Sequence, residues 1–270
     1  MFFKKQQKVA SVSALSEEAA GQDEVPGYER PSDASIMAFQ KELSDATAAS
    51  QPLVSSLRSL ANLFDEYNQA DVRFQLKIND LKEKKYTTYR TCRGDGNCWF
   101  RAIGAHLALL TARASVDKKV GFAYLEGWHA HWVANKSDDL ASWLLQLTDT
   151  WKTELSAGGY EWDAVDFFYE SVHALLGALP SLTSEDLLAR FNDEETSNGM
   201  IVVLRLLCSA YMKTHPDLFT PFLEDGYMDL ADFCQREVDA FGVESGELQI
   251  IGTVNALKIP CSVHLDKSSL

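Results

Sequence analysis

One cysteine of this chain lies where a nucleophilic thiolate can be built. Cys98 ends the stretch Gly94-Asp-Gly-Asn-Cys and directly precedes a segment whose apolar residues recur at helical spacing. Gly94 and Gly96 permit backbone angles that a side chain would forbid, and Asn97 can cap a helix that starts at the cysteine. The free amides and the dipole of a first helical turn favour negative charge. We therefore expect the pKa of Cys98 to fall from about 8.5 toward neutrality, and we expect the same amides to be able to hold an oxyanion.

The helix that must hold this cysteine is also visible in the sequence. Between residues 98 and 110 the apolar positions share one helix face, which should be buried: Trp99, Ile103, Leu107 and Leu110. A buried helix keeps its first residue in one place. The alternative is that Cys98 is a small core residue and that the glycines merely form a turn. That alternative does not explain why Asp, Gly, Asn and Cys lie together before an amphipathic helix, so we favour the functional interpretation.

The same residues connect the chain to a known family. Residues 94–102, GDGNCWFRA, resemble the nucleophile motif of the ovarian-tumour (OTU) family of cysteine proteases, and of its otubain branch in particular. Residues 63–90 resemble the helical lead-in of otubains, residues 187–212 resemble their central helices, and residues 222–265 continue the similarity. The resemblance covers roughly residues 57–265. It implies cleavage of isopeptide bonds to ubiquitin and an α+β, papain-like OTU cysteine protease fold, here mostly helical with a small β-sheet truncated at the C-terminus.

Carried over residue by residue, the resemblance assigns roles within this loop. It makes Cys98 the nucleophile and Asp95 the residue that supports the oxyanion loop, in which Gly96 and Asn97 supply backbone amides. The chemistry is acyl transfer: the cysteine attacks the carbonyl, a thioester forms, the lysine amine leaves and water completes hydrolysis. The resemblance thus implies a deubiquitinating cysteine protease, a hydrolase that uses neither a cofactor nor a metal.

The general base is the part of the otubain pattern that this sequence lacks. Otubains place a histidine, with an orienting residue two positions later, beyond the strand that matches residues 259–265, whereas this chain ends at Leu270. The general base is therefore unknown. His106 lies eight residues after the nucleophile, and at ~1.5 Å per residue this is about 12 Å along a helix, too far for a hydrogen bond. His264 matches a non-catalytic position, and strand alternation puts it on the more polar face.

Two explanations and three functions follow from the missing histidine. Either the sequence is a shortened product of an ordinary otubain gene, which we favour because lost strands would leave an unpaired sheet edge, or the protein has lost hydrolysis. The leading function is a thiol isopeptidase that acts on ubiquitin conjugates and polyubiquitin chains. The alternative is a catalytically weak or inactive protein of the same fold that binds ubiquitin or a ubiquitin-conjugating enzyme. A third is redox regulation, in which the Cys98 thiol is reversibly oxidised.

The chain divides into three parts. Residues 1–34 are polar and should form a disordered tail. Residues 35–85 should form an N-terminal helical arm, with one helix over residues 33–46 and another that follows Pro52 as far as Tyr67. Related otubains use such an arm to contact ubiquitin or a ubiquitin-conjugating enzyme, although a helix simply packed on the domain explains the pattern at least as well. Residues 86–270 should form the OTU-type catalytic domain, with its C-terminal strands missing.

Further elements of this domain can be placed from composition and periodicity. The Thr- and Tyr-rich residues 86–92 predict an extended segment. The stretch Thr183-Ser-Glu-Asp predicts a helix start, because an acid follows a hydroxyl by three residues. A core helix with a buried, inert Cys208 should follow, then two more helices and a strand, over residues 200–211, 228–238, 248–257 and 259–265. Residues 120–162 are rich in tryptophan, and we interpret them as an inserted helical pair that shapes substrate access.

Composition narrows the classes of partner and compartment. The chain has 270 residues, 46% of them hydrophobic, and a net charge of -14. It lacks a basic patch with interleaved aromatic residues, so we do not expect nucleic acid binding, and an acidic surface better suits a basic protein partner. Five cysteines, no secretion signal and no apolar run near ~18 residues predict free thiols in a cytoplasmic, or also nuclear, protein without a membrane span. Cys261 and His264 lack the second ligand pair that a zinc site needs.

Overall fold

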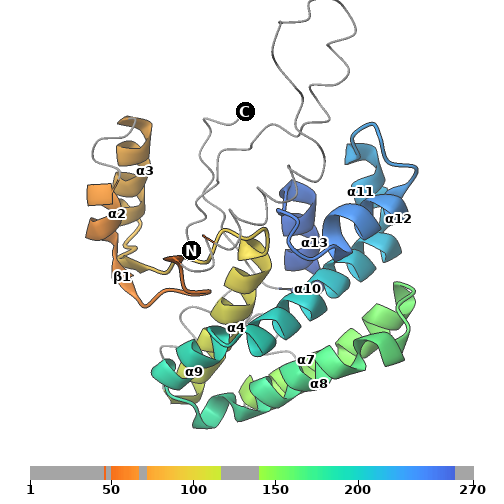
Figure 1. Cartoon of the computed structure of the whole chain (residues 1–270), viewed down its shortest axis with the longest axis horizontal. Helices are drawn as coiled ribbons and strands as arrows, with labels where there is room; N and C mark the ends of the chain where they lie inside the picture. The colour runs from red at the N-terminus through yellow and green to blue at the C-terminus, as the bar shows by residue number, and fades with distance from the viewer. Residues whose placement is uncertain (1–45, 47–49, 67–71, 117–139, 259–270) are drawn as a thin grey trace, which may run out of the picture.

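The structure is a computed structural model that describes residue 46 and residues 50–66, 72–116 and 140–258 (Figure 1). The elements before Cys98 are β1 (Arg58–Ser59), α2 (Leu60–Glu66), α3 (Val72–Glu83) and β2 (Thr88–Tyr89). The long helices are α4 (Cys98–Val116), α7 (Leu140–Ala157), α8 (Trp162–Ala178), α10 (Glu194–Thr214) and α13 (Glu247–Leu257). The shorter elements are η1 (Leu179–Ser181), α9 (Ser184–Phe191), α11 (Pro216–Phe219), η2 (Thr220–Phe222), α12 (Leu230–Phe233) and the π-helix η3 (Cys234–Asp239). The described residues are thus mostly helical with a small sheet, as expected.

α10 is the central helix of the domain. Figure 1 shows it crossing the molecule, and α4, α7, α8 and α13 all pack against it. Most of its residues are buried, because its sequence is apolar on nearly every side rather than along one stripe. It begins after Asp193, whose carboxylate accepts a hydrogen bond from the Thr196 amide at 2.9 Å. The prediction of a central core helix with a buried Cys208 is confirmed.

α7 and α8 lie side by side and pack on α10 (Figure 1). Trp151 of α7 is fully buried, and the Trp162 ring at the start of α8 packs edge to face on Tyr169, with ring centroids 4.7 Å apart. These two tryptophans therefore belong to the packing of the domain. Residues 117–139 lie outside the described residues, so the inserted helical pair that we expected is described only from α7 onward.

The segment before α2 is extended rather than helical. We expected a helix directly after Pro52, but Val54 forms an antiparallel β-bridge with Cys92, and β1 pairs antiparallel with β2. Backbone pairing with the segment that leads into the loop before Cys98 outweighs the helical periodicity here, so the helix begins only at Leu60. The same pairing confirms the extended segment predicted over residues 86–92.

α2 and α3 share a small core of their own. Residues from α2, α3 and β2 are buried together: Leu60, Leu63, Ile78, Leu81 and Tyr89. In Figure 1 this helix pair stands to one side of the larger helical body. The helix expected over residues 33–46 lies outside the described residues, apart from residue 46.

α9 begins with the predicted capping box. The Asp186 amide donates to the Thr183 hydroxyl at 3.1 Å, and the Thr183 amide donates to the Asp186 carboxylate at 3.1 Å. The helix predicted over residues 248–257 is confirmed by α13. The helix predicted over residues 228–238 is instead divided between α12 and the π-helix η3, whose Val238 carbonyl accepts a hydrogen bond from Arg205 of α10. The strand predicted over residues 259–265 lies outside the described residues.

Candidate active site

Cys98 is the first residue of α4 and is half-buried. Beside it, Trp99 Nε1 donates a hydrogen bond to Thr253 Oγ1 of α13 at 3.2 Å. Further along, Gly104 lets α4 approach α10 so closely that a Cβ there would lie 2.6 Å from the Met200 side chain. The apolar face expected from the sequence is buried at each of its positions whose side chain the structure describes, namely Trp99, Ile103 and Leu107. This packing holds the thiol at a fixed point.

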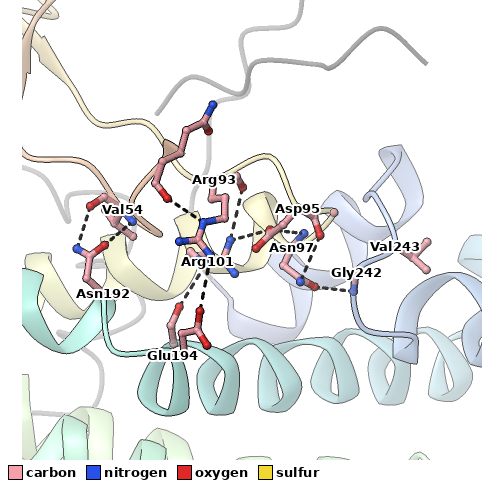
Figure 2. Close-up of polar contacts among 12 residues, drawn as sticks. Val54, Arg93, Asp95, Asn97, Arg101, Asn192, Glu194, Gly242 and Val243 are labelled. Carbon is pink, nitrogen blue, oxygen red and sulfur yellow. Dashed lines mark hydrogen bonds and ion pairs between the residues drawn. The ribbon is translucent and has the colours of Figure 1, made fainter. Parts of the chain in front are cut away.

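Asp95 ties the loop before Cys98 to α4. Its Oδ1 accepts a hydrogen bond from the Asn97 amide at 3.1 Å and forms an ion pair with Arg101 Nη1 at 2.7 Å (Figure 2). The Arg101 side chain is only 1% exposed, and its Nε also donates to Ser197 Oγ of α10 at 3.2 Å. A guanidinium buried in this way is costly to separate from its carboxylate. The shape of the loop therefore depends on Asp95, while its part in catalysis stays a prediction.

Gly96 and Asn97 pack against the segment that follows η3. Gly96 has a φ of +77°, and a Cβ here would lie 1.8 Å from the Gly242 carbonyl oxygen, so a side chain does not fit. The buried Asn97 side chain accepts one hydrogen bond at Oδ1 from the Gly242 amide at 2.9 Å (Figure 2), and two from Arg205. We expected Asn97 to cap α4, but its side-chain oxygen binds these groups. Its backbone amide donates to the Asp95 carboxylate. An oxyanion-binding role for the backbone amides of Gly96 and Asn97 therefore stays a prediction.

The pKa of Cys98 is raised to about 11, whereas its place at a helix N-terminus led us to expect a lowered value. Burial of the thiol is the main cause, and the carboxylates of Glu244 and Asp95 add to it because nearby negative charge disfavours a thiolate. The Trp99 amide and Arg101 act in the opposite direction, less strongly. The expectation was wrong because it counted the helix dipole and omitted burial and the two acids. Most of the Cys98 thiol is therefore neutral at pH 7.

The described residues do not supply an evident general base. His173 of α8 stacks on Tyr169, and His215 at the end of α10 stacks on Tyr211, so each ring packs on an aromatic side chain four residues before it. His215 also lies ten residues beyond Arg205, the α10 residue that binds Asn97 beside Cys98. Ten residues are about 15 Å along a helix. The remaining histidine side chains lie outside what the structure describes: His106, His129, His131 and His264. No general base is assigned within the described part of the chain.

Three residues of this site were not singled out from the sequence. Arg101 follows Cys98 within the motif, and Arg205 interrupts the apolar run of the core helix. A charged residue within a helix that is apolar on most sides was the available signal, because such a charge must find a buried partner. Glu244 carried no such signal, since it lies in a loop and acts on Cys98 only through the tertiary structure.

The described residues offer neither a metal site nor a membrane-spanning helix. Within residues 50–66, 72–116 and 140–258, no group of three or more His, Cys, Asp or Glu side chains is arranged to hold a metal ion. No helix in the same ranges combines the length and the apolar character needed to cross a membrane. Four cysteines there are free thiols, namely Cys92, Cys98, Cys208 and Cys234.

Comparison with known families places the chain. The family described as Peptidase C65 Otubain matches residues 46–269. The chain belongs to the otubain family. Ubiquitin thioesterase OTUB1 of Homo sapiens is 33% identical to this otubain over 233 residues, which are 86% of this chain and 77% of the relative. Ubiquitin thioesterase OTUB2 of Homo sapiens is 31% identical over 193 residues, 71% of each chain.

Solved structures share the fold of this otubain. The structure of h/ceOTUB1-ubiquitin aldehyde-UBC13~Ub is similar to it with a TM-score of 0.67 and 25% identity, covering 84% of this chain and 80% of that chain. The corresponding complex with UBCH5B~Ub gives the same values. The OTU cysteine protease fold that the sequence predicted, mostly helical with a small sheet, is thereby confirmed.

Proposed function

We propose that this otubain is a deubiquitinating cysteine protease that hydrolyses isopeptide bonds between ubiquitin and lysine through a thioester at Cys98. The observation that carries the proposal is the position of that thiol, half-buried at the start of α4 behind a loop that Asp95 holds in shape. The relatives named ubiquitin thioesterases and the shared fold support it. The expected substrates are ubiquitin conjugates and polyubiquitin chains.

Acylation begins when the Cys98 sulfur attacks the isopeptide carbonyl, and the lysine amine leaves once it has gained a proton. The negative charge that develops on the carbonyl oxygen lies near the N-terminus of α4, where the first-turn amides and the helix dipole favour an anion. Water then hydrolyses the thioester and frees the ubiquitin C-terminus. Asp95 keeps the loop in one shape throughout, because its carboxylate binds both Asn97 and Arg101.

The raised pKa makes deprotonation a step of the reaction rather than a property of the free enzyme. The pKa of Cys98 is about 11, so at pH 7 roughly one molecule in 10⁴ carries the thiolate. The thiol proton must therefore pass to a base as the sulfur attacks. Neither His173 nor His215 is assigned to this step.

A second candidate function is binding without efficient hydrolysis. The raised pKa of Cys98 favours it, because a neutral thiol is a poor nucleophile. The similar solved structures are complexes of OTUB1 with ubiquitin aldehyde and with UBC13~Ub or UBCH5B~Ub. In this version the chain binds ubiquitin or a ubiquitin-conjugating enzyme through the arm over residues 35–85. Val72 and Leu76, one turn apart on α3, are 66% and 64% exposed and offer an apolar contact.

Cleavage of di-ubiquitins of each linkage tests the main proposal. We expect the full chain to cleave at least one linkage and Cys98→Ala to abolish the cleavage. Cys92→Ala is the matched control, because Cys92 is also a half-buried free thiol with a raised pKa, about 12, but lies before the loop rather than on α4. The Cys92→Ala variant should still cleave di-ubiquitin. Tight ubiquitin binding without cleavage of any linkage would support the second function.

Pull-down with a ubiquitin-charged conjugating enzyme tests the arm. The double substitution Val72→Asp with Leu76→Asp should weaken binding and leave di-ubiquitin cleavage intact. Phe167→Asp is the control, because Phe167 is equally exposed, 66%, but lies on α8. Equal binding by both variants and the wild type would remove the arm from the proposal.

The compartment is inferred from thiol chemistry. The described cysteines are free thiols, which supports a reducing environment. We therefore propose that the protein is cytoplasmic, or also nuclear. Fluorescence imaging of the tagged full chain tests this proposal, and a signal confined to secretory vesicles would contradict it.

A further inference from the structure

Arg205 reaches the nucleophile loop from the core helix α10. Its side chain is 1% exposed, and its guanidinium lies over the Phe100 ring at 4.6 Å from the centroid. Nε and Nη2 donate to Asn97 Oδ1 at 3.2 and 2.9 Å, and Nη2 also donates to the Gly96 carbonyl at 3.0 Å. The guanidinium thus binds the two residues that directly precede Cys98.

The same guanidinium binds the segment that faces this loop. Nη1 donates to the Val238 carbonyl, at the end of η3, at 2.9 Å, and Nη2 donates to the Val243 carbonyl at 2.7 Å. Between these two acceptors lies Gly242, whose amide donates to Asn97 and whose carbonyl oxygen occupies the space that a side chain on Gly96 would need. Arg205 therefore joins three separate segments: the nucleophile loop, the end of η3 and the loop after it.

The charge of Arg205 is not neutralised by any of these five hydrogen bonds. All the acceptors are neutral carbonyl or amide oxygens, whereas Arg101 is paired directly with the Asp95 carboxylate. Burial lowers the pKa of Arg205 to about 10, which leaves it charged at neutral pH, and Asp95 and Asp239 act on it through space. A buried charge held by neutral oxygens is costly, so packing alone does not explain it.

We propose that Arg205 is a positioning residue for Cys98, which locks the Gly96–Asn97 turn against the 238–243 segment and directs an unpaired positive charge toward the site where anions form. The charge favours the thiolate and the oxyanion of the tetrahedral intermediate, and the five bonds keep the thiol and the first-turn amides of α4 in one geometry. The catalytic part of the proposal rests on the function proposed above, whereas the effect on the thiol does not.

Alkylation of Cys98 by iodoacetamide as a function of pH tests the proposal without ubiquitin. Mass spectrometry of the Cys98 peptide separates this thiol from the other four cysteines. Arg205→Gln removes the charge and should raise the pKa of Cys98, so alkylation between pH 7 and 9 becomes slower than in the wild type. Arg205→Lys keeps the charge but cannot bind three segments at once. We expect it to restore the pH profile and still to label slowly with a ubiquitin probe that carries a C-terminal electrophile.

Arg236→Gln is the matched control, because Arg236 is an arginine that is 55% exposed and paired with Asp232. The pH profile of Cys98 alkylation in this variant should equal that of the wild type. Thermal unfolding of each variant separates misfolding from a local effect. If Arg205→Gln does not fold, Arg205→Lys carries the test through its slowed probe labelling. A folded Arg205→Gln with a wild-type pH profile, or an Arg205→Lys with wild-type labelling, would overturn the proposal. Wild-type protein that cleaves no di-ubiquitin, but whose alkylation still depends on Arg205, would overturn only the proposed function.

Discussion

Replacing Asp95 with alanine should separate the stability of the nucleophile loop from the acidity of its thiol. The substitution removes the carboxylate that pairs with Arg101 at 2.7 Å and accepts the Asn97 amide at 3.1 Å. Arg101 keeps Ser197 Oγ at 3.2 Å and the Arg93 carbonyl at 3.5 Å as acceptors (Figure 2). Removing one partner of a buried ion pair costs about 3–5 kcal/mol. Because Asp95 is 21% exposed, we expect the lower end, a loss of about 3 kcal/mol in the free energy of unfolding.

The same substitution should lower the pKa of Cys98, because the Asp95 carboxylate is one of the charges that raise it. Alkylation of Cys98 at pH 7 should therefore become faster, while cleavage of ubiquitin conjugates becomes slower as the loop loses its support. Urea unfolding followed by tryptophan fluorescence measures the free energy of unfolding. Mass spectrometry of the Cys98 peptide measures the alkylation rate. Asp95→Asn, which keeps an acceptor oxygen without the charge, should lose less stability and should still lower the pKa. Wild-type stability or slower alkylation in Asp95→Ala would refute this reasoning.

Other changes test separate parts of the structure. Gly96→Ala should lower the free energy of unfolding by at least about 2 kcal/mol in urea titration and abolish probe labelling, because the new Cβ meets the Gly242 carbonyl at a φ of +77°. Alkylation of Cys98 should keep rising from pH 7 to 10, since its pKa is about 11, and a plateau near pH 7 would contradict this. Thr183→Ala should cost about 1 kcal/mol in thermal unfolding through loss of the α9 cap and leave cleavage unchanged; a loss of cleavage would speak against a purely structural cap.

The helix that begins at Cys98 and the tight loop before it could be predicted from the sequence because both rest on local features. The glycines around Asp95 permit the tight loop, and the apolar spacing after Cys98 predicts a helix buried on one face. The capping box at Thr183 is equally local. These elements agree with the structure because each is decided by residues within a few positions of one another.

The features that sequence reasoning missed depend on distant residues. The pKa of Cys98 is set by its burial and by Glu244, which is 146 positions away in the chain (244 minus 98). The extended form of the segment before α2 depends on pairing with Cys92 and its neighbours. Arg205 appears in the sequence only as a charge in an apolar helix, and its acceptors near Asn97 and Val243 lie on other segments. Such contacts cannot be read from periodicity or spacing.

The proposed hydrolysis requires a Cys98 sulfur that the C-terminus of ubiquitin can reach and react with. A ubiquitin probe with a C-terminal electrophile, incubated with the full chain and followed by peptide mapping, measures this directly. We predict a single adduct on Cys98 that disappears in Cys98→Ala and persists in Cys92→Ala. An adduct on another cysteine, or no adduct on a folded chain that binds ubiquitin, would contradict it.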